Sequence, residues 1–262
     1  MDWGLENRLN RILKPDTGRT VMLAVDHGYF LGPTSGLEDP GRTVEPLLPY
    51  ADSLMLTRGV LRQCIPASSD IPVVLRVSGG TSILSELSGE GLTVATDDAI
   101  RLNASAITLS VFVGGEGERE TLLNLAKLCD VGQKYGIPVL AVTAVGKDMV
   151  RDARYLGLAC RICAEIGAHF VKTYYCDGFE EVIANTPIPV VIAGGKKIGE
   201  REAIELAHNA IKAGASGVDM GRNIFQSDCP VGMIRAVRSV VHENATVNDA
   251  FEIYRQEKDA RG

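Results

Sequence analysis

The sequence predicts an α/β protein built as a single (β/α)8 TIM barrel, with a short N-terminal helix and an extra C-terminal helix. Eight short runs rich in Val, Leu and Ile alternate with stretches of helical period, a pattern typical of parallel strands joined by helices. Within the runs, polar side chains gather toward the carboxyl ends, which is the end of a barrel that carries functional sites.

The number and spacing of the expected strands favour a closed barrel over an open sheet. In chain order they cover residues 20–28, 51–59, 72–79, 106–114, 138–144, 168–175, 189–195 and 217–222. No Pro/Gly/Ser-rich linker interrupts them, so we expect residues 1–262 to form one domain. Residues 1–19 are expected to hold a helical plug at the bottom of the barrel. Residues 246–262 are expected to form a helical appendix, with Thr246 and Asp249 as its capping box.

Alternation within the strands predicts which side chains face the barrel interior. In the first run, Val21 and Val25 would face the helices, whereas Met22, Ala24 and Asp26 would face inward. The positions that face the helices are aliphatic in each run. The inward positions become polar toward the carboxyl end, which predicts a polar mouth at that end of the barrel.

Charge and hydropathy argue against several classes of function. The formal net charge of -6 disfavours a general nucleic-acid surface, because binding to a phosphate backbone needs a basic face. No apolar run is long enough to span a bilayer, and the start is amphipathic rather than a signal peptide, so we expect a cytoplasmic protein with no membrane partner. Cys160 and Cys163 form a CxxC inside a helical pattern, and we interpret them as small buried residues rather than metal ligands.

Lys172 stands out because it interrupts a strand that is otherwise expected to be buried. In the stretch GAHFVKTYY it shares one face with Phe170 and Tyr174. Burial disfavours the charged form of a lysine, and a neutral amine on a rigid strand is a nucleophile for a carbonyl carbon. The sequence favours such Schiff-base chemistry over the alternative, a structural ion pair with Asp26 or Asp219.

The other polar residues at the expected strand ends would surround this lysine in one mouth. Asp26 is placed to relay protons or to orient the amine. Ser110 and Thr143 carry less weight, since barrels accommodate hydroxyl groups in hydrogen-bonded layers. His27 has the opposite phase, so we expect it to pack or hydrogen-bond at the loop. The complete set is Asp26, His27, Arg58, Arg76, Ser110, Thr143, Lys172, Asp219 and Arg222.

Two glycine-containing loops predict a phosphate site. The seventh strand ends in IAGGKK, where Lys196 or Lys197 would add a point charge, and the eighth ends in GVDMGR. Glycines let the backbone approach a ligand, and a helix that follows presents free N–H groups. Phosphate sites in barrels are often built from the loops after strands seven and eight, so two such signals point to one anion site.

Several long motifs resemble the archaeal-type class I fructose-bisphosphate aldolase superfamily. They are VMLAVDHGYFLGPTSGLE, AVTAVGKDMVRD, VKTYY, VIAGGKK and GASGVDMGRNIFQSD. The resemblance implies a barrel that assembles into large homo-oligomers, often decamers. It implies that Lys172 is the Schiff-base residue and Asp26 the acid of the first strand. It assigns phosphate binding to Gly194, Gly195, Lys196, Gly221 and Arg222.

The end of the fifth strand departs from the sugar-bisphosphate aldolases of this superfamily, which carry a tyrosine there as a proton carrier. Here residues 143–146 read TAVG, without a phenol. An aldol cleavage must deprotonate a substrate hydroxyl, so the departure argues against fructose-bisphosphate cleavage. The segment resembles instead the thiolase branch of the superfamily, which processes phosphorylated autoinducer-2 with coenzyme A as a co-substrate.

We therefore expect a thiolase that works through a Lys172 iminium on a phosphorylated dione. The thiolate of coenzyme A would add to an acetyl carbonyl, the adjacent C–C bond would break toward the iminium, and dihydroxyacetone phosphate would be released. An aldolase acting on a ketose phosphate such as fructose 1,6-bisphosphate, or a related sugar-precursor synthase, is the alternative. A third is a metabolite-binding protein that has lost its chemistry. No permanently bound cofactor and no metal are expected.

Overall fold

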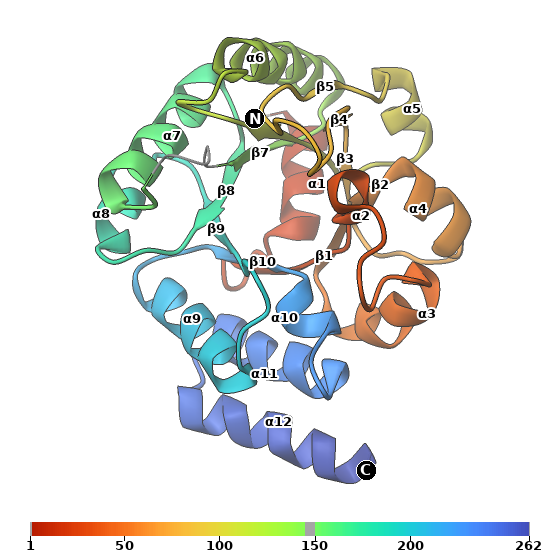
Figure 1. Cartoon of the computed structure of the whole chain (residues 1–262), viewed down its shortest axis with the longest axis vertical. Coiled ribbons are helices and arrows are strands. Elements are labelled where there is room, and N and C mark those ends of the chain that lie inside the picture. The colour runs from red at the N-terminus through yellow and green to blue at the C-terminus, as the bar shows by residue number, and fades with distance from the viewer. Residues whose placement is uncertain (1, 145–149, 262) are drawn as a thin grey trace.

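The computed structural model describes residues 2–144 and 150–261. Within them, eight parallel strands close into a barrel in the order β1-β10-β9-β8-β7-β6-β3-β2 (Figure 1). The predicted (β/α)8 barrel is therefore confirmed. The barrel strands are β1 (Thr20–Ala24), β2 (Ser53–Thr57), β3 (Val73–Arg76), β6 (Ala106–Val111), β7 (Val139–Thr143), β8 (Phe170–Tyr174), β9 (Val190–Ala193) and β10 (Gly217–Met220).

Helices surround the barrel, as Figure 1 shows. Four of the longer ones are amphipathic and bury one face toward the barrel. In chain order the helices are α1 (Trp3–Ile12), α2 (Gly28–Leu31), α3 (Pro40–Val44), the 3-10 helix η1 (Glu45–Tyr50), α4 (Arg58–Cys64), α5 (Thr96–Arg101), α6 (Glu118–Tyr135), α7 (Ala153–Ile166), α8 (Phe179–Ala184), α9 (Glu200–Lys212), α10 (Arg222–Phe225), α11 (Pro230–Glu243) and α12 (Val247–Arg261). None of these described helices is long and apolar enough to cross a membrane.

Strand side chains divide into two buried clusters, as alternation predicts. Val21 and Val25 belong to the larger cluster, between strands and helices. Met22 and Ala24 belong to the smaller cluster inside the barrel. Phe170, two residues before Lys172, lies in that inner cluster too. The inner cluster fills the lower part of the barrel, so the polar residues at the strand ends lie above an apolar floor.

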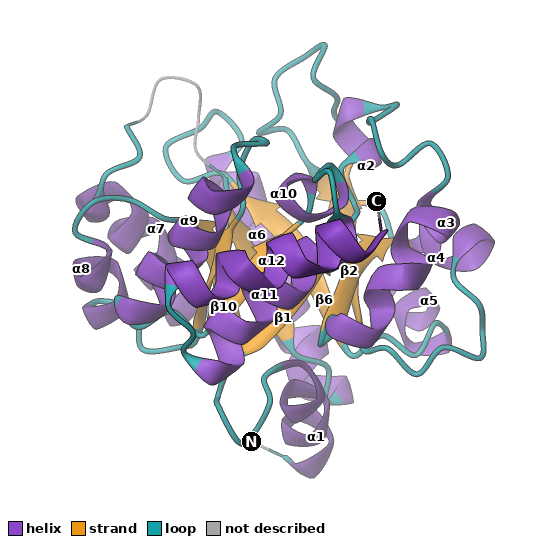
Figure 2. Ribbon diagram, turned by 90° about the horizontal axis from the view of Figure 1, so that it is seen from below, coloured by secondary structure: helices purple, strands orange, loops and turns teal. Residues whose placement is uncertain are grey.

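Helix α1 lies at the amino end of the strands. Its Leu9 and Ile12 pack into the inner cluster, and Asp2 caps the helix by accepting the N–H of Leu5 at 2.9 Å. Figure 2 shows α1 at the opposite end of the barrel from α2 and α10. The opening of the barrel is therefore at its carboxyl end.

The third expected strand is longer in the prediction than in the structure. β3 ends at Arg76, and the next residues form β4 (Ser78–Gly79), which pairs antiparallel with β5 (Gly91–Leu92). Gly80, with a φ of 110°, turns the chain away from the barrel in a conformation that other residues rarely adopt. This hairpin returns Glu90 to the barrel mouth, which simple strand counting did not anticipate.

The C-terminal helix begins where its capping box predicts. The hydroxyl of Thr246 accepts the N–H of Asp249 at 3.2 Å and donates to its carboxylate at 2.7 Å. Helix α12 then packs on α11 and α9, outside the helix ring (Figures 1 and 2).

Candidate active site

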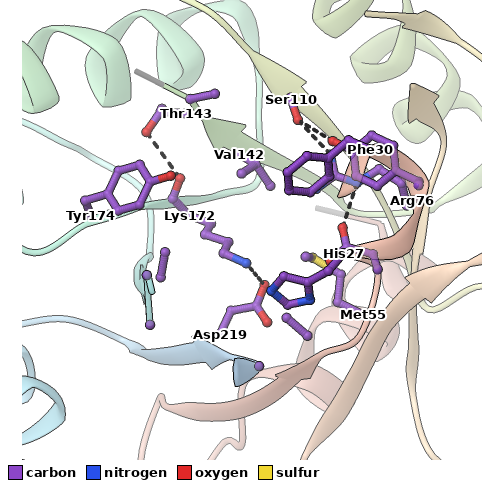
Figure 3. Close-up of a pocket in the computed structure, with 18 of the residues that line it drawn as sticks. His27, Phe30, Met55, Arg76, Ser110, Val142, Thr143, Lys172, Tyr174 and Asp219 are labelled. Atoms are coloured by element: carbon purple, nitrogen blue, oxygen red, sulfur yellow. Dashed lines mark hydrogen bonds and ion pairs between the residues drawn. The ribbon is translucent and has the colours of Figure 1, made fainter. Parts of the chain in front are cut away.

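A cavity of about 280 Å³ opens at the carboxyl ends of the barrel strands. Most of the predicted site residues line it, although they come from distant parts of the chain. The predicted residues in its lining are Asp26, His27, Arg76, Ser110, Thr143, Lys172, Gly194, Gly195, Asp219, Gly221 and Arg222. Figure 3 shows side chains from several strands converging on this space.

Lys172 forms a buried ion pair with Asp219. Its Nζ lies 2.8 Å from Asp219 Oδ2, and the two residues are 8% and 1% exposed. Burial raises the pKa of Asp219, and the charge of Lys172 offsets only part of that rise. A raised pKa makes the Asp219 carboxylate a better proton acceptor, and it lies within hydrogen-bond distance of the lysine Nζ.

Asp26 pairs with Arg76 rather than with the lysine. Arg76 Nε donates to Asp26 Oδ2 at 2.9 Å, and both side chains are buried. Burial by itself would raise the pKa of Asp26, but the positive charges of Arg76 and Lys172 outweigh burial and leave the pKa below its ordinary value. Asp26 is therefore an ionised carboxylate, and the residue that orients the amine is Asp219.

A hydrogen-bonded group surrounds Arg76 on the same side of the cavity. Its Nη1 donates to Ser110 Oγ at 3.1 Å, and its guanidinium carbon lies 5.0 Å from the centre of the Tyr29 ring. The Tyr29 hydroxyl donates to Glu90 Oε1 at 2.5 Å, and Ser78 donates to the other oxygen of that carboxylate at 2.6 Å. Burial raises the pKa of Tyr29, so the phenol keeps its proton.

His27 both packs at the loop, as its phase predicts, and lines the cavity. Its ring meets that of Phe225 edge-on at 5.7 Å, and Figure 3 shows the imidazole pointing toward the Lys172–Asp219 pair. Burial lowers the pKa of His27 to about 4. Its Nδ1 is buried and has no hydrogen-bond partner among the described residues. A neutral imidazole with an unpaired ring nitrogen therefore faces the amine of Lys172.

The loops after β9 and β10 meet on one side of the cavity. Arg222 Nη2 donates to the carbonyl of Gly195 at 2.9 Å, and Asn223 Nδ2 donates to the carbonyl of Gly194 at 2.6 Å. Gly195 has a φ of 71°, in the region that favours glycine. The Arg222 Nε is buried without a hydrogen-bond partner among the described residues. This unpaired N–H of a cation is suited to an anionic group in the cavity.

Gly221 has no room for a side chain. A Cβ at this position would collide with the backbone oxygen of Ala24 and with the ring of His27. The glycine therefore lets the β10 loop approach β1, which brings Arg222 and His27 to the same cavity.

Three predicted positions differ from expectation. Arg58 does not point into the mouth: it begins α4, is exposed, and contacts Asp98 at 3.3 Å, because the chain leaves the barrel at that residue. Lys196 is exposed and does not line the cavity. Thr143 borders the cavity, but its phase is outward, and its hydroxyl donates to Thr173 at 2.8 Å instead of facing the lysine. The side chain that β7 directs inward is Val142.

The end of β7 brings no phenol beside the lysine within the described residues. Val142, Thr143 and Ala144 line the cavity there, while positions 145 and 146 lie outside the described residues. Two phenols reach the cavity from other elements, Tyr29 from α2 and Tyr174 from the end of β8.

Comparisons with known proteins agree with this geometry. The family description "DeoC/LacD family aldolase" matches residues 20–227. The chain belongs to the DeoC/LacD aldolase family. It is 56% identical to 3-hydroxy-5-phosphonooxypentane-2,4-dione thiolase of Escherichia coli over 98% of this chain and 89% of that protein. It is 55% identical to the Photorhabdus laumondii protein of the same name, with the same coverage. The resemblance stated from the motifs is confirmed.

The fold has a solved counterpart outside these close relatives. An archaeal fructose 1,6-bisphosphate aldolase superposes with a TM-score of 0.81 at 24% identity, and the match covers 91% of this chain and 99% of that one. At this identity the likeness supports the barrel fold of the present chain and says nothing about the substrate of this chain.

Sequence reasoning missed three residues that shape the DeoC/LacD family site. Tyr29 lies three positions after Asp26 in DHGYF, on the short helix α2 that follows β1. Its closeness to Asp26 in the sequence was the one signal that could have indicated it. Glu90 gave no local signal, because the β4–β5 hairpin that carries it is set by long-range packing. Asn223 follows Arg222 directly, but only the structure shows it holding two loops together.

Proposed function

We propose that the protein is a Schiff-base thiolase that cleaves 3-hydroxy-5-phosphonooxypentane-2,4-dione and transfers its acetyl group to coenzyme A. The observation that carries the proposal is Lys172, a buried amine paired with Asp219 in a cavity that also holds an unpaired Arg222 N–H. The 56% identity to the thiolase of that name over nearly the whole chain supports the substrate.

The anion site and the lysine define how such a substrate would lie. The phosphate would contact Arg222 and the backbone at Gly194 and Gly195, after strands β9 and β10. β8 is the neighbour of β9, so the carbon next to the phosphomethylene group, C4, would lie at Lys172. The acetyl end, C1 and C2, would then extend across the cavity toward Arg76 and Ser110.

The chemistry follows from the two charged pairs. Asp219 would take a proton from Lys172, the amine would add to C4, and loss of water would leave an iminium. The thiolate would add to C2, and the C2–C3 bond would then break. The iminium at C4 would accept the electron pair of that bond. The guanidinium of Arg76, held by Asp26, would stabilise the negative charge on the C2 oxygen. Protonation of the enamine at C3 and hydrolysis release dihydroxyacetone phosphate.

Trapping with borohydride tests the imine directly. With the phosphorylated dione, the wild-type protein should gain mass at Lys172, and Lys172→Ala should abolish both the adduct and turnover. As a matched control, Lys127→Ala alters an exposed lysine on α6 and should leave both unchanged. An adduct on another residue, or turnover by Lys172→Ala, would contradict the assignment.

Product analysis separates the thiolase from an aldolase. The thiolase requires coenzyme A and forms acetyl-CoA from the dione. Cleavage of fructose 1,6-bisphosphate or another ketose phosphate without coenzyme A would favour the aldolase instead. The absence of a phenol among residues 142–144 supports the thiolase, because an aldol cleavage needs a base for a substrate hydroxyl.

We also propose a cytoplasmic homo-oligomer, a decamer by family resemblance. Large apolar side chains that are exposed in the single chain support assembly: Trp3 is 80% exposed and Leu84 93% exposed. Light scattering of the purified protein gives the mass of the particle, and a monomer would contradict the proposal.

A further inference from the structure

A second cavity, of about 550 Å³, adjoins the lysine cavity. It is formed around α2, α3, α4 and the β4–β5 hairpin. Asp26, Tyr29 and Arg76 line both cavities, so these three side chains form the wall between them. Its other lining residues include Leu37, Thr57, Arg58, Gly59, Val60 and Val94.

The order of strands places this cavity across the barrel from the lysine. In the closed order β1-β10-β9-β8-β7-β6-β3-β2, the strand opposite β8 is β2, with β1 and β3 beside it. Residues at the carboxyl ends of these three strands, Val25, Thr57 and Arg76, line the second cavity. A substrate held by its phosphate at β9 and β10 and by C4 at Lys172 therefore points its acetyl end at the dividing wall.

We propose that this second cavity receives the pantetheine arm of the acyl acceptor, coenzyme A. The inference rests on the proposed function. A pantetheine arm is narrow and mostly apolar with a few amides, which matches a lining of aliphatic side chains, hydroxyl groups and loop backbone. Its thiol would reach C2 at the wall where Arg76 lies, on the side away from the phosphate loops.

Charge at the outer edge fits the nucleotide end of the acceptor. Arg58 is an exposed cation in the lining, and its guanidinium shares the single carboxylate of Asp98 with Arg62. Two cations on one carboxylate leave a positive charge at this edge for a diphosphate. The second cavity thus has an apolar interior, which suits the thiol arm of coenzyme A, and a cationic rim, which suits its phosphates.

Acetyl transfer from the dione to the thiol of coenzyme A would take place at the wall between the two cavities. The thiol gives its proton to a base, its sulfur bonds to C2, and the C2 carbonyl pair moves onto oxygen. When that oxyanion collapses, the C2–C3 bond breaks and its electron pair enters the Lys172 iminium, which yields acetyl-CoA and an enamine. One proton added at C3 and one water at C4 then release dihydroxyacetone phosphate and the free amine.

Filling the cavity tests the assignment. A Cβ on Gly59 meets no atom within 4 Å, so Gly59→Phe adds bulk to the lining of the cavity without a clash at the backbone. We expect the KM for coenzyme A to rise by about tenfold or more, while the Lys172 adduct with the dione forms at the wild-type rate. Gln63→Phe places the same side chain on an exposed position of α4, outside this lining, and should change neither quantity.

An unchanged KM for coenzyme A in Gly59→Phe, or an equal rise in Gln63→Phe, overturns the assignment. Slower adduct formation in Gly59→Phe overturns it as well, because the second cavity would then hold the dione. The proposed function fails on a different readout: the wild-type protein would then form no acetyl-CoA. Thermal unfolding of each variant shows whether it is folded.

Arg58 offers a second variant that does not depend on bulk. Arg58→Gln should raise the KM for coenzyme A severalfold, by about 1 kcal/mol in binding, and leave the KM for pantetheine, which lacks the nucleotide, unchanged. Arg161→Gln removes an exposed cation from an ion pair on α7, outside the cavity lining, and is the matched control. An effect of Arg58→Gln that is equal for both acceptors, or absent for both, contradicts the cationic rim.

Discussion

At the scale of single residues, the site depends on where two buried carboxylates lie. Asp26 and Asp219 are both inside the barrel, yet their pKa values shift in opposite directions. Burial dominates for Asp219, whereas the positive charges of Arg76 and Lys172 outweigh burial for Asp26. The carboxylate with the raised pKa is the one in contact with Lys172, which is the arrangement that the proposed proton transfer from the amine requires.

Asp219→Asn should therefore slow imine formation. The amide cannot accept the lysine proton, and it cannot balance the positive charge of the iminium that follows. We expect the rate of borohydride trapping with the dione to fall about 100-fold, in the usual range for loss of a general acid–base group. Asp130→Asn, at an exposed position on α6, is the control. Trapping of Asp219→Asn at the wild-type rate would show that another group takes the proton.

Protonation of His27 couples the site to stability. Its pKa of about 4 lies below the ordinary value of 6.5, so the unfolded chain binds more protons than the folded one between those values. Stability from this residue is complete above pH 6.5 and falls as the pH drops toward 4. His27→Gln should lose this dependence. Between pH 6.5 and pH 4 its unfolding free energy should fall by less than that of the wild type, with a difference of at most about 3 kcal/mol.

Urea unfolding of both proteins at several pH values measures the difference in slope. Carboxylates that His27 does not influence are common to both proteins and cancel, and the pKa of Asp26, which His27 helps to lower, lies below 3.8 and outside this window. Identical slopes for wild type and His27→Gln would mean that the imidazole is not held neutral in the fold.

At the scale of elements, the site depends on how closely β1 and β10 approach at their carboxyl ends. Gly221 permits this approach, because a Cβ there would meet the backbone of Ala24 and the ring of His27. One residue thus positions elements that are nearly two hundred positions apart in the chain.

Gly221→Ala should destabilise the protein and weaken phosphate binding together. The backbone oxygen of Ala24 cannot rotate away, so the strand ends must separate, at a cost of about 3 kcal/mol in unfolding free energy. Calorimetry and the KM for the dione measure the two effects. Gly157→Ala, in α7, is the control for stability, since its Cβ would lie 3.8 Å from Val182 Cα, at ordinary contact. A wild-type melting temperature for Gly221→Ala would contradict the predicted clash.

At the scale of the whole molecule, a buried carboxylate holds the amino end of the barrel together. Asp52 precedes β2 and is 2% exposed. It accepts the N–H of Val21 in β1 at 2.7 Å and contacts Arg238 at 2.8 Å and His242 at 2.7 Å, both on α11. Two strands and a helix from the other end of the chain therefore meet at one residue. We propose on this basis that residues 1–262 unfold as a single domain.

Asp52→Asn should destabilise that domain by about 3 kcal/mol, because Arg238 loses its buried counter-charge and the groups bonded to Asp52 lose a carboxylate acceptor. Burial raises the pKa of Asp52, but hydrogen bonds from His242 and Arg238 outweigh it and hold the pKa below its ordinary value of 3.8. The contribution is thus present above pH 3.8 and lost as the pH falls through the lowered pKa.

Denaturant unfolding followed by fluorescence and circular dichroism measures both the loss and the number of transitions. Glu165→Gln removes an exposed pair with Arg161 on α7 and should cost less than about 0.5 kcal/mol. Two separate transitions in the wild-type protein would contradict the single domain, and an unchanged midpoint in Asp52→Asn would contradict the role of this carboxylate.

The barrel and the position of the lysine followed from the sequence alone. Strand alternation placed Lys172 inward, because side chains of a strand point to opposite faces in turn. Glycines after the last two strands predicted a phosphate site there, since backbone freedom is a local property that one residue type supplies. The same rules failed at Arg58, where a helix start carries the side chain out of the mouth. They were incomplete at Thr143, which borders the cavity but directs its hydroxyl to Thr173.

Pairing among the charges was decided only by the tertiary structure. The sequence left Asp26 and Asp219 as equal partners for Lys172, and the barrel order sets β10 so that Asp219 reaches the amine while Arg76 takes Asp26. Glu90 and the second cavity arise from a hairpin and from loops that pack far from their sequence neighbours. Periodicity reports which way a side chain points, whereas contacts between distant strands depend on how the sheet closes.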